Sequence, residues 1–163
     1  MKRLTDLLNV QRIKVPLLAD SKEEAIRELI DLLAANGDLS DAQGALDAVL
    51  DRERIRTTGI GNGLAIPHGK SNGVDRPMMA LGRTAEPIGF DSIDDKPVQL
   101  IALLISPPEQ TGPHIQVLAR ACRLLSFSDV QKALCNAATA EQMLQTIRRK
   151  EEELELIPAS PSQ

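Results

Sequence analysis

The stretch that decides the fold is Val98-Gln99-Leu100-Ile101-Ala102-Leu103-Leu104-Ile105, in which Gln99 is the only polar residue. A strand with one solvated face alternates between apolar and polar residues, whereas a strand covered on both faces is apolar almost throughout. We therefore expect a central β-strand here, with helices above and below it. The apolar run from Leu100 to Ile105 is much shorter than the about 20 residues that a membrane-spanning helix needs, so no membrane insertion is expected.

Helical periodicity flanks this strand on both sides along the chain. Two capping boxes, Ser21-Lys22-Glu23-Glu24 and Ser40-Asp41-Ala42-Gln43, predict the starts of two helices. The first helix is expected to end at Asn36-Gly37 and the second at Arg52-Glu53-Arg54, so that the pair forms an αα-hairpin. After the strand, apolar residues recur with the helical period over residues 115–125, 130–134 and 139–154.

Shorter signals complete the predicted sheet. Apolar runs at Gly63–Ile66 and Met78–Gly82 predict two more strands, and Leu4–Leu8 predicts a single helical turn. The segment Arg12–Leu18 contains Pro16 and predicts an edge strand, because proline cannot donate a hydrogen bond to a second neighbour. The order of helices, strands and helices around one buried sheet predicts an α/β fold, namely a single three-layer α/β/α domain with a mixed β-sheet flanked by helices.

The length of 163 residues fits one domain with a core of its own. We expect this domain to span residues 1–154. Residues 155–163 contain two prolines and two serines and are expected to form a disordered tail.

Charge and aromatic content exclude several classes of function. The chain has 19 Lys and Arg against 23 Asp and Glu, and the two signs are interspersed, so a nucleic-acid partner is not expected. Phe90 and Phe127 are the only aromatic residues, which leaves no platform for stacking bases or sugar rings. The core must therefore be aliphatic.

The small number of cysteines and histidines does not favour a metal site or a disulfide framework. Cys122 and Cys135 form no CxxC pair, and we interpret them as small buried apolar residues in a reducing compartment. A His/Cys zinc site would need both cysteines and both histidines of the chain. The N-terminus lacks the apolar core of a secretion signal, so a cytoplasmic location is expected.

The segment Thr57–Ser71 is the most unusual in the chain and resembles two nucleotide-binding motifs without matching either. A dinucleotide fingerprint reads G-x-G-x-x-G after a strand, whereas Gly59, Gly61 and Gly63 follow a predicted helix as G-x-G-x-G. A Walker A loop has four residues between its glycines, but five separate Gly63 from Gly69. We therefore expect neither a bound nucleotide nor any other cofactor, and no metal.

His68 is the first candidate for chemistry, because it lies where a short apolar strand and a proline end. A neutral imidazole has a lone pair at pH 7 and can attack phosphorus without a separate base. Transfer of a phosphoryl group then requires positioning and compensation of the charge on its oxygens. The alternative is a loop histidine that makes one structural hydrogen bond.

His114 and Arg52 are the candidates for charge compensation. His114 is predicted in the first turn of a helix, where free N–H groups and the helix dipole favour an anion. Arg52 is predicted at the end of the second helix. Each residue has a simpler interpretation, an exposed helix-start residue for His114 and a solvated charge at a helix end for Arg52.

The site segment resembles a known family. Glu53, followed after six residues by Ile60-Gly61-Asn62-Gly63-Leu64-Ala65-Ile66-Pro67-His68-Gly69, is similar to the active-site signature of the fructose/mannitol-type enzyme IIA proteins of the bacterial phosphoenolpyruvate phosphotransferase system. The resemblance is nearest the nitrogen-regulatory branch and extends from about Leu4 to Leu154. Two departures are Thr57, where a serine is usual, and Gly112-Pro113 before His114.

The resemblance implies roles for the three candidates and names the partners. His68 matches the histidine that accepts a phosphoryl group from the phosphocarrier HPr or its nitrogen-branch counterpart. His114 matches the second histidine of the active site, and Arg52 matches the arginine near the phosphate. We therefore expect an enzyme IIA, a phosphohistidine phosphotransferase of the nitrogen-regulatory type, whose output is regulation through protein targets.

Two other functions remain open from the sequence. A sugar-transport enzyme IIA would pass the phosphoryl group to a IIB component of a fructose/mannitol-type permease. A regulatory interaction module would present the charge on His68 to partners without passing it on, an interpretation favoured by the absence of a IIB or IIC domain in this sequence.

Overall fold

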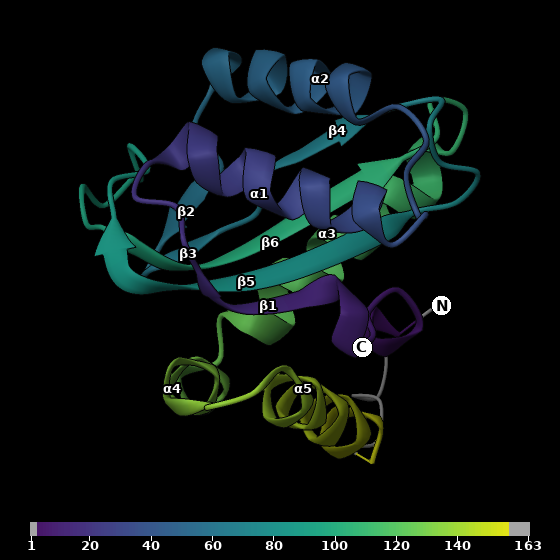
Figure 1. Ribbon diagram of the computed structural model, residues 1–163. Coiled ribbons are helices and arrows are strands. Elements are labelled where there is room, and N and C mark those ends of the chain that lie inside the picture. Colours follow the sequence, from purple (N-terminus) through teal and green to yellow (C-terminus); the bar gives the residue numbers. More distant parts are fainter. Residues whose placement is uncertain (1–2, 157–163) are drawn as a thin grey trace, which may run out of the picture.

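The predicted central strand is present as β6 (Val98–Ser106), in a computed structural model that describes residues 3–156. Helices cover both faces of its sheet (Figure 1), so the three-layer α/β/α prediction is confirmed. The remaining strands are β1 (Ile13–Leu17), β2 (Gly59–Gly61), β3 (Leu64–Ala65), β4 (His68–Lys70) and β5 (Met78–Ile88). The α-helices are α1 (Lys22–Ala35), α2 (Ala42–Ile55), α3 (Thr111–Leu125), α4 (Ser128–Asn136) and α5 (Ala140–Glu155).

The sheet is mixed, with the strand order β1-β5-β6-β3-β2. Strand β6 pairs antiparallel with β5 along one edge. Along its other edge it pairs in parallel with two short strands in succession, first with β3 at Leu100 and Ile101 and then with β4 from Leu104 to Ser106. The predicted edge position of the strand that contains Pro16 is confirmed, because β1 pairs with β5 and ends the strand order.

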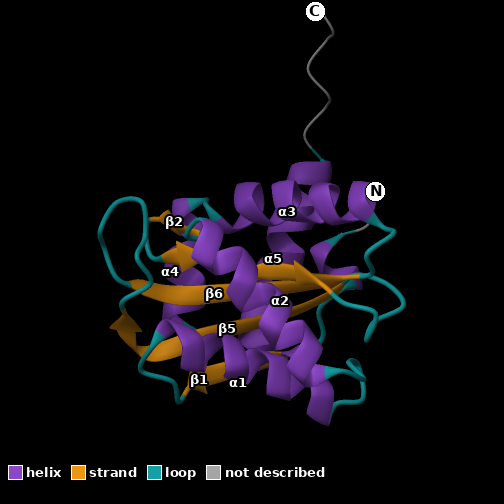
Figure 2. Cartoon of the chain, turned by 90° about the horizontal axis from the view of Figure 1, so that it is seen from above, coloured by secondary structure: helices purple, strands orange, loops and turns teal. Residues whose placement is uncertain are grey.

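Alternate side chains of β6 belong to two separate cores. Leu100, Ala102 and Leu104 pack in the cluster formed with α3, α4 and α5. Ile101, Leu103 and Ile105 pack in the cluster formed with α1 and α2, the layer that faces the viewer in Figure 2. Burial of a Leu or Ile side chain contributes about 1.5–3 kcal/mol, so the apolar run of β6 stabilises both layers at once.

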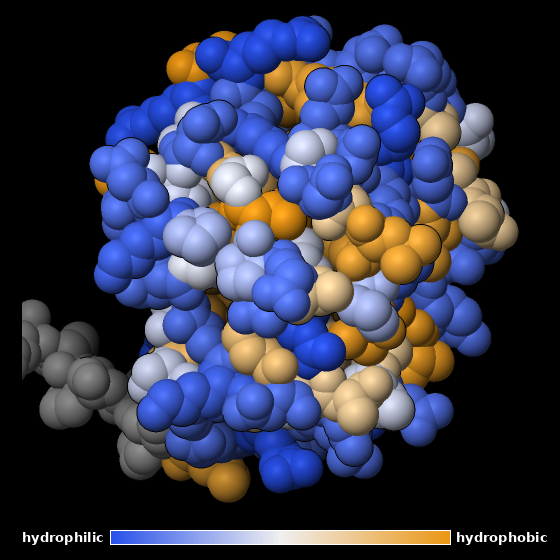
Figure 3. All heavy atoms as spheres, turned by 60° about the vertical axis from the view of Figure 1, so that its left-hand side comes forward, coloured by the Kyte–Doolittle hydropathy of each residue, from blue (hydrophilic) through white to orange (hydrophobic). Residues whose placement is uncertain are grey.

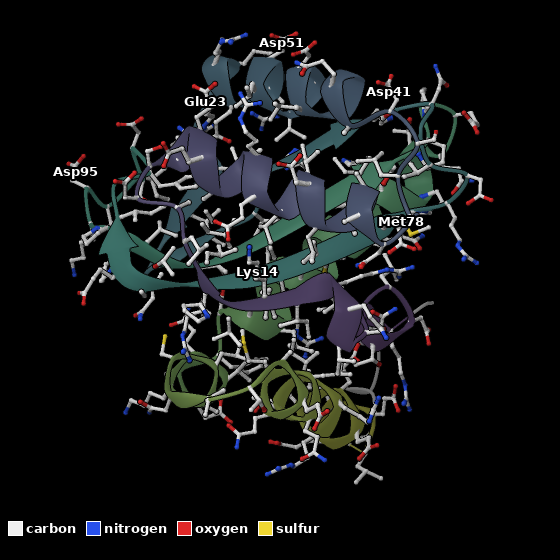
Figure 4. All side chains as sticks on the ribbon, viewed as in Figure 1. Lys14, Glu23, Asp41, Asp51, Met78 and Asp95 are labelled. Carbon is white, nitrogen blue, oxygen red and sulfur yellow. The ribbon has the colours of Figure 1, made fainter. Side chains whose placement is uncertain are left out.

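The two N-terminal helices begin near the predicted caps. Ser21 accepts a hydrogen bond from the Glu24 N–H, as the first capping box requires. The second helix is capped by Asp41, labelled in Figure 4, which accepts from the Gly44 N–H at 3.0 Å, so the prediction of a cap at Ser40 is wrong by one residue. A carboxylate is an equally good cap because it also carries an acceptor oxygen and suits the positive end of the helix.

Two predicted strands need correction, and the short strands β2 and β4 were not predicted. The predicted strand Gly63–Ile66 is limited to β3, and His68–Lys70 forms a separate strand, β4. Strand β5 continues from the predicted Gly82 to Ile88, past a register shift in its pairing with β6. Half of the residues of this extension, namely Ala85, Glu86 and Pro87, are exposed, and the extension lacks the apolar run on which the prediction depended.

The ends of the domain and the cysteines complete the comparison. Cys122 and Cys135 are free thiols packed against the core, but they are half-buried and not fully buried as predicted. Helix α5 ends at Glu155, and residues 157–163 of the predicted tail lie outside the described part of the chain, so the tail stays a prediction. None of the helices within residues 3–156 combines the length and the apolar character that crossing a bilayer requires.

Candidate functional site

The glycine-rich segment folds as a tight turn between two short strands. Gly61, Asn62 and Gly63 all have positive φ angles, of 102°, 56° and 79°. This left-handed conformation is readily adopted by glycine and tolerated by asparagine. The Asn62 N–H donates to the Asp94 carboxylate at 2.9 Å, which ties the turn to the loop after β5. The glycines therefore shape the backbone that leads to His68.

His68 is the first residue of β4 and pairs with Leu104 of β6. The next residue, Gly69, faces α2: a Cβ atom there would lie 3.0 Å from the backbone nitrogen of Val49. Helix α2 therefore packs directly on β4, and its last turn, which carries Arg52, is brought beside His68.

The His68 imidazole is held by its own chain segment. Its Nδ1 lies 2.9 Å from the Ile66 carbonyl oxygen. Because a carbonyl oxygen only accepts, Nδ1 carries the proton and the lone pair of the neutral ring is on Nε2. Burial lowers the pKa of His68 against the opposing effect of the Ile66 carbonyl, and the positive charge of Arg52 lowers it further. At pH 7 the ring is therefore neutral and its Nε2 is nucleophilic.

His114 lies in the first turn of α3, as predicted. It is buried, and the centroid of its ring is 5.5 Å from that of His68 with an angle of 60° between the ring planes. Burial, His68 and Lys70 lower the pKa of His114 to about 4, so this ring is neutral as well. Pro113 precedes it without breaking the helix, because the first turn of a helix has no internal acceptor for its N–H groups.

Arg52 and His68 line one pocket of about 270 Å³. Arg52 is half-buried in the last turn of α2, and its Nη1 donates to the Arg56 carbonyl oxygen at 2.9 Å. The same pocket is lined by Arg56, which the sequence analysis did not single out. The structure thus places Arg52 and His68 at one pocket and His114 in ring contact with His68.

The remaining walls of the pocket are mostly apolar and include Ile60, Leu118 and the exposed Ile93. Figure 3 shows one face of the molecule on which apolar residues are similarly set among hydrophilic ones. The Cys122 thiol also lines the pocket, but burial raises its pKa, which keeps it protonated. His68 is therefore the better nucleophile of the two.

Glu53 fixes the segment that precedes the turn. Its buried carboxylate accepts hydrogen bonds from the N–H and hydroxyl of Thr58 at 2.9 and 2.5 Å, and forms an ion pair with Lys22 at 2.8 Å. The neighbouring Thr57 hydroxyl donates to the Phe90 carbonyl oxygen at 2.9 Å. Both threonine hydroxyls are thus used to hold the loop. In the sequence, Glu53 is only the first residue of the signature, and its role in positioning the loop becomes visible only from its contacts in the structure.

Ser106 is a further residue at the site that the sequence analysis missed. It is fully buried at the end of β6, and its Oγ lies 2.7 Å from His114 Nδ1. A serine that directly follows a long apolar run is the one signal that could have indicated it. Within the described part of the chain, no group of three or more His, Cys, Asp or Glu side chains is arranged to hold a metal ion.

Residues 6–150 match the family described as "Phosphoenolpyruvate-dependent sugar phosphotransferase system, EIIA 2". A fructose-specific EIIA component of the phosphotransferase system from Haloferax volcanii is 37% identical over 141 residues, which cover 85% of this chain and 92% of that protein. The nitrogen regulatory protein of Pseudomonas aeruginosa is 33% identical, over 90% of this chain and 96% of its own.

A solved structure gives the same relationship for the fold. The crystal structure of the nitrogen regulatory protein IIA-Ntr from Neisseria meningitidis superposes with a TM-score of 0.79 at 32% sequence identity. The match covers 88% of this chain and 98% of that one. The similarity in sequence and in fold therefore extends over nearly the whole described domain.

Proposed function

The chain belongs to the EIIA 2 family of the phosphoenolpyruvate-dependent sugar phosphotransferase system, and we propose that His68 is the residue that carries its phosphoryl group. Proteins of this family are phosphotransferase components that carry the group on a histidine. The observation that supports His68 is the bond from its Nδ1 to the Ile66 carbonyl oxygen, since this bond leaves the lone pair of Nε2 free on a residue that lines the pocket.

The transfer is a displacement at phosphorus between two imidazoles. The lone pair of His68 Nε2 forms a new P–N bond while the P–N bond of the donor phosphohistidine breaks, and that electron pair stays on the donor nitrogen. The proton on His68 Nδ1 remains on its bond to Ile66 throughout. Both bonds are phosphoramidates, so the exchange is close to neutral in energy, and the protein acts by orientation and electrostatics.

Arg52 and His114 stabilise the phosphoryl group in this proposal. The group adds a charge of about −1.5 to −2 to a pocket in which His68 itself is neutral. The Arg52 guanidinium supplies a positive charge from the end of α2. His114, being neutral, contributes an N–H donor and no charge.

The phosphoryl donor is HPr or its nitrogen-branch counterpart, and the output we propose is regulation. The nitrogen regulatory relatives, which match this chain over nearly their whole length, support that role. A partner that covers the apolar wall of the pocket would have to desolvate the phosphoryl charge, so a regulatory target should discriminate between the two forms at least about tenfold. We place the reaction in the cytoplasm, in keeping with the two free thiols of the chain.

A second candidate function is sugar transport. The fructose-specific relative, at 37% identity, favours a protein that passes the phosphoryl group to a IIB component. The two functions share the site and differ in what happens to the phosphoryl group after His68 has received it.

Phosphorylation in a defined mixture tests the site. Incubation with phosphoenolpyruvate, enzyme I and HPr, or with the nitrogen-branch proteins, should add one acid-labile, base-stable phosphoryl group to the wild type and none to His68→Ala. Cys122→Ala, which changes the other nucleophile of the pocket, is the matched control and should be phosphorylated like the wild type. Undiminished phosphorylation of His68→Ala would contradict the proposal. A wild type that takes up no phosphoryl group from either carrier would instead support the non-catalytic interaction module.

A second experiment separates regulation from transport. The phosphorylated protein is isolated and mixed with purified IIB components of fructose and mannitol permeases. Retention of the group on His68, with lysate partners that differ between wild type and the charge-mimicking His68→Asp, supports regulation. Rapid loss of the group to a IIB component would establish the transport function instead.

A further inference from the structure

We propose that Ser106 is a positioning residue for His114: its hydroxyl donates to Nδ1 and thereby fixes the ring proton on Nε2, the nitrogen available to the phosphoryl group. The proposal rests on the function proposed for His68. It adds a residue to the site that is remote from the signature segment in sequence and acts only through another side chain.

The geometry of the pair is that of a strong, buried hydrogen bond. The Ser106 Oγ and His114 Nδ1 atoms are 2.7 Å apart, and both residues are buried, with 0% and 6% of their surface exposed. The Ser106 backbone is fixed by the sheet, since its carbonyl oxygen accepts from the Ser71 N–H at 2.9 Å. The hydroxyl is thus presented from a rigid strand end.

The register of the sheet places Ser106 beneath His114. His68 pairs with Leu104 and Lys70 pairs with Ser106 in the parallel ladder between β4 and β6. Side chains two residues apart on a strand point to the same face, so Ser106 lies on the face of Leu104, which packs in the core with α3. His68 and Ser106 therefore reach the first turn of α3 from the same side of the sheet.

The direction of the hydrogen bond follows from counting protons. If Nδ1–H donated to Oγ, the Ser106 hydroxyl proton would be buried without an acceptor, because the hydroxyl makes no other hydrogen bond within residues 3–156. A buried donor without a partner costs about 1–3 kcal/mol. If the hydroxyl donates to Nδ1, its proton is bonded, and the single proton of the neutral ring resides on Nε2.

This choice of tautomer decides what His114 can do. Phosphoryl oxygens only accept hydrogen bonds, so a neutral imidazole helps them through an N–H and repels them through a lone pair. Because burial and the neighbouring His68 and Lys70 keep His114 neutral, it has one N–H to offer. When the Ser106 hydroxyl donates its hydrogen bond to Nδ1, that nitrogen carries no proton, so the single N–H of His114 is on Nε2.

The first arm of the test is the tautomer itself, read from imidazole ¹⁵N chemical shifts of the unphosphorylated protein. Wild type and Ser106→Thr, which keeps the hydroxyl, should show His114 protonated on Nε2 alone. Ser106→Ala should show a mixture of both tautomers. Protonation of His114 on Nδ1 in the wild type would overturn the proposal. This arm needs no phosphoryl transfer, so its result stands even if the function proposed for His68 fails.

The second arm is a double-mutant cycle on the rate of phosphoryl uptake from the carrier. Ser106→Ala should slow uptake about tenfold in the wild-type background and have no effect in the His114→Ala background. Ser92→Ala is the matched control, because Ser92 is buried and its hydroxyl has no partner among the described residues, and its rate should equal that of the wild type. An equal slowing by Ser106→Ala in both backgrounds would show a merely structural serine and refute the positioning role.

Discussion

The ring centroids of His68 and His114 are 5.5 Å apart, and the two rings are hydrogen-bonded to different kinds of partner. In the β4 region, His68 donates from Nδ1 to the carbonyl oxygen of Ile66, two residues earlier in the same segment. In the α3 region, His114 is bonded to the Ser106 hydroxyl, on a different element of the fold. The proposed nucleophile is thus oriented by the backbone of its own segment. The histidine that we propose to assist it is bonded to a side chain from another element of the fold.

The glycines beside the two histidines differ in a second respect, the packing around them. A Cβ atom on Gly69 would lie 3.0 Å from both Cγ2 and the backbone nitrogen of Val49, because α2 is pressed against β4. A Cβ atom on Gly112, two residues before His114, would meet nothing within 4 Å. The β4 strand is therefore closely packed at Gly69, whereas the start of α3 is open at Gly112 although His114 itself is buried.

The largest effect expected from disrupting either region, short of removing His68, is on the rate of phosphoryl transfer. Under the proposed function, Arg52→Ala removes a stabilising group that lines the pocket and His114→Ala removes one that contacts His68. Loss of one such group typically slows the reaction about 10²–10³-fold. The phosphoryl group should still be found on His68, as mass spectrometry of the modified peptide can check. Arg54→Ala is the control, since Arg54 is exposed at the same helix end and pairs with Asp51. If both variants were phosphorylated at the wild-type rate, Arg52 and His114 would have no part in phosphoryl transfer.

The second effect concerns stability and separates the two glycines. Gly69→Ala forces a methyl group against the Val49 backbone and should lower the free energy of unfolding by about 1–3 kcal/mol. Gly112→Ala has room and should be neutral or stabilising by up to about 1 kcal/mol, because it reduces the entropy of the unfolded chain. Urea unfolding of both variants measures the difference. Equal destabilisation by the two substitutions would mean that the packing of α2 on β4 is not the constraint we describe.

The third effect is a dependence of stability on pH. The folded pKa of His114, about 4, lies below the ordinary value of 6.5, so the unfolded chain binds the proton more readily. The free energy of unfolding should therefore be constant above about pH 7 and fall as the pH decreases from 6.5 toward 4. His68, whose pKa burial also lowers, contributes with the same sign.

Comparison with His114→Gln isolates the contribution of His114. The free energies of unfolding of the two proteins should converge as the pH falls. Only the wild type loses stability through His114, because the variant lacks the group whose protonation is disfavoured in the folded state. If the free energies of unfolding of wild type and variant differed by the same amount from pH 7 to pH 4, the His114 ring would be as easily protonated in the folded protein as in the unfolded chain.

The sequence predicted the features that depend on strong local patterns. The apolar run in β6 predicted the covered central strand, and the capping boxes predicted α1 and α2, with the second cap displaced from Ser40 to Asp41. His68 was singled out because a proline and glycines frame it. The placement of His114 in the first turn of α3 followed from the helical period that begins after it.

The sequence did not predict what only packing decides. The short strands β2 and β4 carry too few residues for a periodic signal, and they exist because β3 and β6 offer them partners. The hydrogen bonds of Glu53 to Thr58, its ion pair with Lys22 and the contact of Ser106 with His114 join segments whose relative placement no local pattern specifies. Both are buried polar residues, whose partners become known only when the fold is known.

The most direct test of this account is to identify the nitrogen that carries the phosphoryl group. The protein is labelled with ¹⁵N, phosphorylated by its carrier, and examined for scalar coupling between ³¹P and the imidazole nitrogens. We predict coupling to Nε2 of His68, with a proton still on Nδ1 bonded to the Ile66 carbonyl oxygen. Coupling to Nδ1 of His68, or to either nitrogen of His114, would contradict the central claim that the backbone of Ile66 leaves Nε2 of His68 as the acceptor.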